Sequence, residues 1–406
     1  MTRSSHLSIK HLTPAGRRRV LAEAGAFDGS RFDALLQASL EDWTDDVGGF
    51  TENAVGVFPM ALSVATGFVV NKVERFVPMV TEERSVVAAA CKAAALCRPH
   101  GFHVKAKPPL ARAQILLVPD RPGAVSCAPL VNREAERFVA IVRGEGDPLV
   151  KYGGGLLAIE ARKTPLPGEP EATLVNLTID VGEIMGANKA TRIAEALGSL
   201  IEKHSSSRVA FKICGNDTPE RRVRAVAVWR KEALGEDVWK RKNRDVGNAD
   251  PPAEETRRLG DDAIGRFLLA QECAEIDPER AATHDKGIMN GVDAVCLATG
   301  QDTRAVNAGF WVEACRGGTC RPLSRFRRTT EGHLRGELEM PLAVGVKGGA
   351  TAHPMVVHNL RTMRCQTAAE LMQVIGAVGL AQNFAALFSL TNEGIIASHE
   401  RLKKGS

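Results

Sequence analysis

The sequence predicts an α+β protein in which a small α+β domain is inserted into a larger, mostly helical domain. Two observations lead to this fold class. Between residues 109 and 219, apolar and polar residues alternate as in strands, whereas the flanking segments have helical spacing or long apolar runs. We therefore expect a discontinuous large domain (1–108 and 220–390), a small domain (109–219) and a short C-terminal segment (391–406).

The composition is that of a soluble globular protein. Of the 406 residues, 44% are apolar and 25% are charged, and the formal net charge of +5 is too small to argue for DNA or RNA. The N-terminal MTRSSHLSIKH lacks the apolar stretch of a signal peptide. The longest apolar segment, residues 371–390, contains Gln382 and Asn383, so we expect a buried helix and not a membrane span. These features predict a cytoplasmic protein without nucleic-acid or membrane partners.

Cysteines and histidines give no sign of a disulfide framework or a metal site. The nine cysteines are scattered, and Cys315 and Cys320 form a lone C-x4-C without a second pair. His353 and His358 are separated by a proline and do not have convincing ligand spacing. We expect reduced thiols and no metal.

The first part of the large domain is predicted to begin with helical pieces over 15–45. A buried segment over 52–71, irregular or rich in strands, follows. An alanine-rich helix is then expected over 83–97, and Pro99 and Gly101 end it.

The inserted domain is predicted to combine strands and helices. Its clearest strand is 173–181, where Val175, Leu177, Ile179 and Val181 lie on one face. The other expected elements are, in order, a strand at 113–119, a helix near 131–143, a turn at the glycines 153–155, a helix over 189–203 and a strand at 207–214.

A further strand is expected at 221–230. Residues 235–260 are charged and contain two consecutive prolines, so we expect a surface insertion or linker whose basic cluster is a solvated face. Helices resume at 261 and continue to the end of the chain, with a glycine-rich interlude at 344–350.

Lys286 stands in ATHDKGIMNG (282–291), a run of small and turn-forming residues in which a solvated lysine is unusual. Asp302 follows in ATGQDTRAV. Asp302 is either the N-cap of a following helix or the carboxylate that keeps the lysine charged. The second reading requires the apolar, strand-like DAVCLATG between them to return the chain to Lys286.

Two further segments contain groups that could transfer a proton. Glu82 and Glu83 precede the alanine-rich helix, where they either complement its dipole or place one glutamate inward, protonated by burial and able to act as an acid. His399, in the closing EGIIASHERLKK, is either a complement to a helix C-terminus or a proton donor.

Gly186-Ala187-Asn188 follow the strand at 173–181 and begin a helix. Backbone N–H groups and the helix dipole at such a terminus form a site for a pyrophosphate. No G-x-G-x-x-G occurs, so the Rossmann fingerprint is absent. A simple turn remains the alternative.

Eight stretches, taken in order, resemble 3-hydroxy-3-methylglutaryl-CoA (HMG-CoA) reductase of the soluble class II type found in bacteria and archaea. They cover most of the chain and are together far more specific than any one of them. The stretches are ENAVG (52–56), EERSVVAAA (82–90), DVGEIMGAN (180–188), RAATHDKGIMNG (280–291), ATGQDTRAV (298–306), LEMPLAVGVKGGAT (338–351), GLAQN (379–383) and EGIIASH (393–399).

The resemblance implies a substrate-binding large domain with an inserted non-Rossmann, ferredoxin-like dinucleotide-binding domain. It implies reduction of the HMG-CoA thioester to mevalonate and CoA with two nicotinamide cofactors consumed, or the reverse oxidation of mevalonate. It also implies a homodimer, or an assembly of dimers, with the active site between subunits. Whether the cell uses the reaction for isoprenoid building or for catabolism stays open.

The resemblance also implies roles for four catalytic residues. Lys286 would stabilise the oxyanion of the reduced thioester carbonyl, and Asp302 would hold the lysine charged and oriented. His399 would protonate the leaving CoA thiolate. Glu83, kept protonated by burial beside Asp302, would give a proton to the resulting aldehyde.

Substrate and cofactor contacts follow from the same resemblance. Arg280 matches the arginine for the free carboxylate of the substrate, and Ser85 and Asn290 match its polar contacts. The expected cofactor-binding residues of the loop are Asp180, Met185, Gly186, Ala187 and Asn188.

The choice of reductant is less sharply predicted. Glu145 and Asp147 flank Gly146 ahead of the triple glycine and slightly favour NADH, whose ribose an acidic residue binds. The alternative is NADPH, with its phosphate on a basic residue. The candidates for that contact are Arg143, Lys189 and Arg192.

Three departures from the family pattern stand out. Arg84 replaces a proline common in relatives, the segment 235–260 has no assigned role, and the chain ends seven residues after His399, where many class II enzymes continue into a closing flap. A non-catalytic CoA-binding or nucleotide-binding relative, and a lyase that uses Lys286 as a Schiff base, are the competing interpretations.

Overall fold

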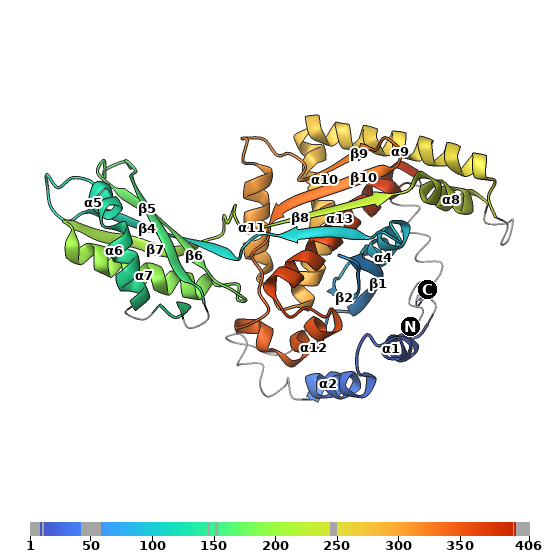
Figure 1. Cartoon of the computed structure of the whole chain (residues 1–406), viewed down its shortest axis with the longest axis horizontal. Helices are drawn as coiled ribbons and strands as arrows, with labels where there is room; N and C mark the ends of the chain where they lie inside the picture. The colour runs from blue at the N-terminus through green and yellow to red at the C-terminus, as the bar shows by residue number, and fades with distance from the viewer. Residues whose placement is uncertain are drawn as a thin grey trace.

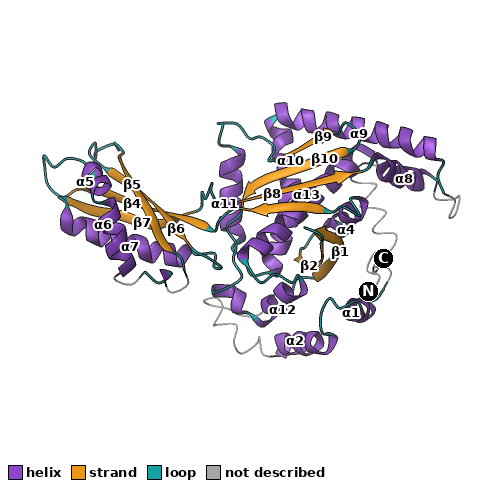
Figure 2. Ribbon diagram, in the orientation of Figure 1, coloured by secondary structure: helices purple, strands orange, loops and turns teal. Residues whose placement is uncertain are grey.

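The computed structural model describes residues 9, 12–41, 58–144, 147–150, 153–243, 250–392 and 394. A small domain built on a four-stranded sheet lies at one end of an elongated molecule, and a larger domain built on a six-stranded sheet forms the rest (Figure 1). Strands and helices mix in both domains (Figure 2), so the predicted α+β class is confirmed.

The small domain has the strand order β5-β6-β4-β7, and all three pairings are antiparallel. This order, with helices in the two crossovers, is that of a ferredoxin-like fold. One face of the sheet packs against the helices through residues such as Ile115, Leu177 and Ile193. The elements are β4 (Leu110–Pro119), α5 (Ala128–Arg133), α6 (Ala135–Gly144), β5 (Gly155–Lys163), β6 (Thr173–Asp180), α7 (Ala187–His204) and β7 (Ser207–Gly215).

The sheet of the large domain has the order β2-β1-β3-β8-β10-β9. All pairings are antiparallel except a single parallel bridge between β1 and β3. Its strands are β1 (Leu62–Val70), β2 (Val73–Val80), β3 (Phe102–Ala106), β8 (Arg222–Trp229), β9 (Ser324–Arg328) and β10 (Leu334–Pro341).

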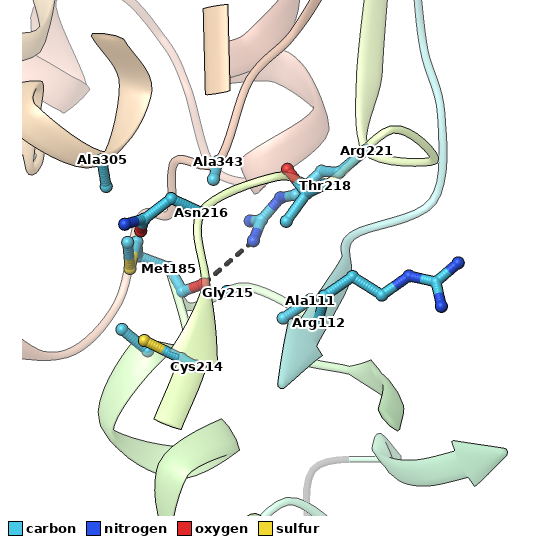
Figure 3. A pocket seen from close by; sticks show the side chains of 11 residues that line it. Ala111, Arg112, Met185, Cys214, Gly215, Asn216, Thr218, Arg221, Ala305 and Ala343 are labelled. Atoms are coloured by element: carbon cyan, nitrogen blue, oxygen red, sulfur yellow. Dashed lines mark hydrogen bonds between the residues drawn. The ribbon is translucent and has the colours of Figure 1, made fainter. Parts of the chain in front are cut away.

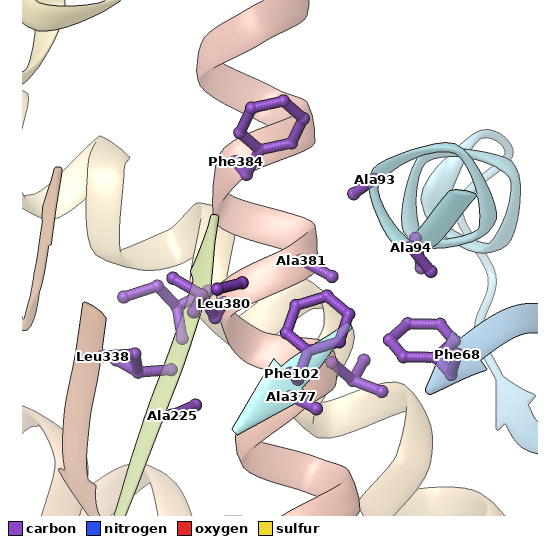
Figure 4. Packing of buried hydrophobic residues seen from close by; sticks show 14 of the residues in the cluster. Phe68, Ala93, Ala94, Phe102, Ala225, Leu338, Ala377, Leu380, Ala381 and Phe384 are labelled. Atoms are coloured by element: carbon purple, nitrogen blue, oxygen red, sulfur yellow. The ribbon is translucent and has the colours of Figure 1, made fainter. Parts of the chain in front are cut away.

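Helix α13 (Ala368–Asn392) is the centre of the large domain's core. It is long and apolar enough to cross a membrane by length and composition, yet 72% of its most apolar window is buried inside the protein. Phe384 stacks on Trp229 of β8, with ring centroids 4.0 Å apart. Figure 4 shows Ala377, Leu380 and Ala381 on the same helix within the buried cluster. The buried helix predicted over 371–390 is confirmed.

Other helices surround this core. Among the residues described, they are α1 (Pro14–Glu23), α2 (Gly29–Glu41), α4 (Val86–Leu96), α8 (Lys231–Lys242), α9 (Ala253–Ile276), α10 (Pro278–Ala298), α11 (Thr303–Ala314) and α12 (Pro354–Thr362), with a short 3-10 helix η4 (Gly349–Ala352).

The linker expected over 235–260 is wrong. Its described ends belong to α8 and α9, which pack against each other. A Cβ added to Gly235 would lie 1.7 Å from the Thr256 carbonyl oxygen, and one on Gly260 would lie 2.1 Å from that of Lys231. These glycines therefore allow close helix packing. The two prolines do not interrupt α9, because Pro252 is its N-cap.

The strand expected at DAVCLATG is also wrong. Residues 293–298 are the last turns of α10, which begins at Pro278 after the capping side chain of Asp277. Val295 and Cys296 are fully buried, and the apolar run reflects a helix covered on several sides. The chain therefore does not return to Lys286 in this segment.

Candidate active site

Lys286 and Glu83 meet although they are far apart in sequence. Lys286 Nζ on α10 lies 3.5 Å from Glu83 Oε2, in the turn before α4. The side chains are 61% and 36% exposed, so solvent screens the pair and it contributes less than about 1 kcal/mol to stability. Two of the four predicted catalytic residues are thus together, on a face open to ligands.

The turn that carries Glu83 has an uncommon backbone. Ser85 has φ +85°, in the left-handed region, directly before the first residue of α4. The Thr81 hydroxyl accepts a hydrogen bond from the Glu83 N–H at 3.1 Å. A non-glycine residue in this region costs about 1 kcal/mol or more, so the surrounding structure maintains the turn. Arg84 is exposed.

A cavity of about 380 Å³ opens beside this pair. Glu83, Ser85, Lys286 and Asn290 form one end of it. Helices α4 and α13 form its walls, with alanines from α4 and Phe384 and Phe388 from α13. The cavity is therefore polar around Lys286 and Glu83 and mostly apolar along α4 and α13.

A second hollow of about 240 Å³ shares Glu83, Val86 and Asn290 with the first. Asp293 lines it and accepts a hydrogen bond from Asn307 Nδ2 at 2.8 Å. Burial raises the pKa of the Asp293 carboxyl, and the nearby charge of Glu82 raises it further. The sequence interpretation missed Asp293, because it lies in the segment assigned to a strand.

The small residues beside Lys286 serve helix packing. A Cβ on Gly291 would lie 2.9 Å from Gln382 Cβ and Val378 Cγ1 of α13, so α10 and α13 approach closely there. Arg280 is half-buried and lies about 9 Å before Lys286 along α10. It shares a helix face with Thr283 and Gly287, which line the cavity.

Asp302 is the N-cap of α11. Its Oδ1 accepts hydrogen bonds from the N–H groups of Arg304 and Ala305, both at 3.1 Å. The remainder of α10 after Lys286 spans about 18 Å. Among the described residues, Lys286 pairs with Glu83, whereas Asp302 is recorded in an ion pair with Arg304 and in none with Lys286.

The loop that was predicted to bind the cofactor, called the cofactor loop, joins β6 to α7. Asp180 Oδ1 accepts from the Gly182 N–H at 2.9 Å and closes the turn. Gly186, at φ +98°, is the N-cap of α7, and a Cβ there would lie 2.4 Å from Val181 Cγ1. Only glycine fits this position. Ala187 and the exposed Asn188 begin the helix, and no side chain caps its first N–H groups among the residues that the structure describes.

Asp147 has a structural position. It is 8% exposed, its Oδ1 accepts from the Leu149 N–H at 2.9 Å, and its Oδ2 accepts from the Leu156 N–H at 2.8 Å. Both oxygens are therefore engaged. Glu145 and His399 lie outside the described residues, so their roles stay predictions.

Comparison with known proteins decides the family. A family model described as hydroxymethylglutaryl-coenzyme A reductase matches residues 13–404. The chain belongs to the HMG-CoA reductase family. It is therefore an NAD(P)H-dependent oxidoreductase that acts on HMG-CoA.

Relatives of the reductase come from archaea and bacteria. The 3-hydroxy-3-methylglutaryl-coenzyme A reductase of Archaeoglobus fulgidus is 34% identical over 397 residues, which are 95% of this chain and 82% of the relative. A probable reductase of Borreliella burgdorferi is 29% identical over 380 residues, covering 91% of this chain and 81% of that protein.

Solved structures of the class II reductase from Streptococcus pneumoniae have the same fold. One, bound to NADPH in open conformations, has a TM-score of 0.79 and 30% identity, covering 93% of this chain and 97% of that chain. Another has a TM-score of 0.81 and 30% identity, covering 97% and 88%.

The two domains of the reductase meet at Arg221, which is fully buried. Its guanidinium donates to the carbonyl oxygen of Met185 at 2.9 Å (Figure 3). It also donates to the carbonyl oxygen of Ile184 at 3.1 Å and to that of Val344. Burial lowers its pKa to about 10, against the charges of Asp180 and Glu183, so it stays protonated at neutral pH. The adjoining hollow of about 10 Å³ is too small for a dinucleotide.

Residues 344–345 of the large domain, which include the Val344 carbonyl bound by Arg221, also contact Gln301 in the turn before Asp302. The Gln301 side chain donates to the Gly345 carbonyl and accepts from the Gly345 N–H, both at 2.9 Å. A Cβ on Gly345 would lie 2.4 Å from Met185 N. The cofactor loop and the turn before Asp302 are thus packed on one backbone segment.

A buried polar network lies beneath Lys286. His284 Nε2 and Ser324 Oγ are 2.6 Å apart, and Ser324 Oγ donates to Asn383 Oδ1 at 2.7 Å. Burial raises the pKa of Asp285 to about 7 and lowers that of His284 to about 3. This network fixes α10 against α13 next to Lys286.

Proposed function

We propose that Lys286 and Glu83 form the reacting centre for the four-electron reduction of HMG-CoA to mevalonate and CoA. The observation that carries the proposal is their 3.5 Å contact at the polar end of a cavity of about 380 Å³. A cation and an acid beside one substrate-sized space suit a carbonyl that gains negative charge and then a proton.

The bound nicotinamide supplies the hydride, and Lys286 stabilises the charge that develops on the thioester oxygen. The ammonium group is 61% exposed in the free chain, so substrate can approach it directly. Glu83 sits within reach of the same oxygen and donates the proton to the aldehyde-level intermediate. His399 protonates the CoA thiolate as it leaves.

The active unit is a homodimer in which a second chain completes the site. Within one chain Asp302 caps α11 and is separated from Lys286 by about 18 Å of helix. Leu297 on α10 and Val312 on α11 are 44% and 46% exposed, beside this region. An apolar surface next to an incomplete site suits a subunit contact.

Mixing inactive chains tests this dimer. Lys286→Ala and Asp302→Ala chains are co-expressed, each with a different affinity tag, and the mixed dimers are isolated. One of the two sites in a mixed dimer carries neither substitution, so about half of the wild-type activity is expected. If the mixed dimers are as inactive as the Lys286→Ala and Asp302→Ala homodimers, Lys286 and Asp302 of one site belong to the same chain.

The reductant is a nicotinamide dinucleotide bound at the N-terminus of α7. The slight preference for NADH now depends on Glu145, because both oxygens of Asp147 accept main-chain hydrogen bonds. Lys189 is half-buried and Arg192 is exposed on the first turns of α7, where either suits the phosphate of NADPH. The ratio of kcat/KM for the two reductants decides between them.

The function is tested by following reduced-nicotinamide absorbance with HMG-CoA. Two molecules of reductant consumed for each HMG-CoA, with activity lost in Lys286→Ala, are expected. Consumption of one reductant per substrate would indicate release of an aldehyde. Binding of HMG-CoA without turnover would favour the non-catalytic interpretation.

A further inference from the structure

The loop that joins α11 to β9 (Figure 1) carries two cysteines that the reacting centre does not use. They are Cys315 and Cys320, the two ends of the lone C-x4-C. Cys315 is the C-cap of α11 and is exposed, whereas Cys320 is half-buried. All nine cysteines of the chain are free thiols. The backbone of the loop decides whether these two thiols can meet.

Two backbone hydrogen bonds close the loop. The Gly318 N–H donates to the Cys315 carbonyl at 2.9 Å and forms a turn, in which Gly318 has a left-handed φ of +84°. The Arg321 N–H donates to the Ala314 carbonyl at 3.0 Å. In antiparallel pairing, the residues next to such a bond lie opposite each other with Cα atoms about 4.5 to 5.5 Å apart. Cys315 and Cys320 are these neighbours, and a disulfide requires a Cα separation of about 4.4 to 6.8 Å.

The two thiols also interact with each other. Burial, followed by the charges of Cys315 and Asp285 and a hydrogen bond with the Cys315 thiol, raises the pKa of the Cys320 thiol to about 11. The hydrogen bond requires the two sulfur atoms to lie close together. Cys320 is therefore protonated at neutral pH, and the exposed Cys315 is the thiol that a reagent in solution reaches first.

We propose that Cys315 and Cys320 form a reversible disulfide by exchange with a small disulfide such as oxidised glutathione. The Cys315 thiolate attacks one sulfur of the small disulfide, whose S–S bond breaks and releases one thiol. Cys320 then loses its proton and attacks the Cys315 sulfur of the mixed disulfide, which releases the second thiol. The two cysteines together lose two electrons and two protons, and the small disulfide gains them.

The first step makes the second step easier. Cys315 has no charge in the mixed disulfide, so one of the causes that raise the pKa of Cys320 disappears. The loop also has room to adjust, because a Cβ added to Gly317 or Gly318 would meet no atom within 4 Å. In a reducing compartment such a pair is usually oxidised only transiently and responds to the redox state.

Peptide mapping tests the proposal. The native, full-length protein is equilibrated in glutathione buffers with an increasing oxidised fraction, alkylated and digested with trypsin without reduction. Trypsin cleaves after Arg316 but not after Arg321, which precedes a proline, so the cysteines fall in peptides 305–316 and 317–325. We expect a disulfide to join these peptides in the oxidising buffers, and both cysteines to be alkylated in the reducing ones.

Matched variants separate the two steps. Cys320→Ser prevents the second step, so Cys315 should keep one bound glutathione. Cys273→Ser removes an exposed cysteine of α9 and should form the joined peptides as the wild type does. Cys320 does not line the cavity beside Lys286, so reduced Cys320→Ser should retain kcat within about twofold, which shows that it folds.

Three results would overturn the proposal. In the first, both cysteines are alkylated even in the most oxidising buffer. In the second, wild-type Cys315 keeps glutathione as Cys320→Ser does, so the two sulfur atoms do not meet. In the third, non-reducing electrophoresis shows covalent dimers that contain the joined peptides, or reduced glutathione does not reopen the disulfide. Peptide mapping requires no turnover, so its result is independent of the proposed function.

Discussion

Two polar contacts of the reductase differ in how firmly they are held. Lys286 and Glu83 meet through one 3.5 Å contact between side chains that are 61% and 36% exposed. Arg221 is fully buried and donates to three carbonyl oxygens where the domains meet. The exposed pair can therefore rearrange when a ligand binds, whereas the buried contacts of Arg221 cannot. Substitutions at the two contacts should separate activity from stability.

The largest effect on activity is expected at the exposed contact. Glu83→Gln keeps the size of the side chain but removes its charge and its acidic proton, so kcat should fall about 10²- to 10⁴-fold. The free energy of unfolding should change by less than about 1 kcal/mol, because solvent screens the pair. Steady-state assays and urea unfolding measure the two quantities. A large loss of stability would indicate that Glu83 has a structural role and not a catalytic one.

At the buried contact of Arg221 we expect the loss of stability to be larger than the loss of activity. Arg221→Met leaves three carbonyl oxygens without their donor, and we expect a loss of about 3–5 kcal/mol in the free energy of unfolding. KM for the nicotinamide should rise more than KM for HMG-CoA, because Ile184 and Met185 belong to the cofactor loop. Arg221→Lys should recover part of both losses.

A second arginine provides the control for this prediction. Arg112 lies at the same junction, but its side chain is 29% exposed and pairs with Glu220. Arg112→Met should cost less than about 1 kcal/mol and leave the cofactor KM nearly unchanged. Similar losses of unfolding free energy in Arg112→Met and Arg221→Met would show that removal of any positive charge from this junction destabilises the protein equally.

Much of the fold was predictable where one face of an element is covered. In 173–181 the alternation marks a strand because helices cover only one side of the small sheet. In 371–390 the polar Gln382 and Asn383 indicated burial within protein, and Asn383 indeed donates to the His284 carbonyl at 2.8 Å. Lys286 and Glu83 were predicted from their motifs, and the ferredoxin-like small domain was predicted from the family resemblance.

The rest depends on contacts that the sequence does not display. Gly235 and Gly260 resemble linker residues until α8 and α9 pack together. In the sequence Arg221 cannot be distinguished from its neighbours Arg222 and Arg224, although their side chains are 19% and 53% exposed and that of Arg221 is buried. Its carbonyl partners come from two distant segments, so its burial is a tertiary property.

The buried network under Lys286 provides a test that depends on pH. Folding raises the pKa of Asp285 from 3.8 to about 7, so the native state retains a proton that the unfolded chain loses. The stabilising effect of Asp285 is therefore complete below about pH 4 and is lost as the pH rises through 7. Asp285→Asn should be more stable than the wild type at pH 8, by up to about 4 kcal/mol, and equal to it near pH 4.

His284 acts in the opposite direction. Folding lowers its pKa from 6.5 to about 3, so its contribution increases as the pH rises between those values. Between pH 4 and 6.5 the two contributions offset each other in the wild type, so the stability of Asp285→Asn should rise over this range where that of the wild type changes little. Parallel pH curves for the variant and the wild type would show that Asp285 is charged in the folded protein.

The smallest effect is expected at the start of α7, between the two contacts compared above. Gly186→Ala places a Cβ at φ +98° and 2.4 Å from Val181 Cγ1, at a cost of about 1–3 kcal/mol. The strain moves the helix start, so KM for the nicotinamide should rise severalfold while binding of HMG-CoA is unchanged. Gly182→Ala is the matched control, because its φ of +55° brings similar backbone strain but its Cβ meets no atom within 4 Å. If both variants weaken cofactor binding equally, backbone conformation and not the close approach to Val181 sets the geometry of the loop.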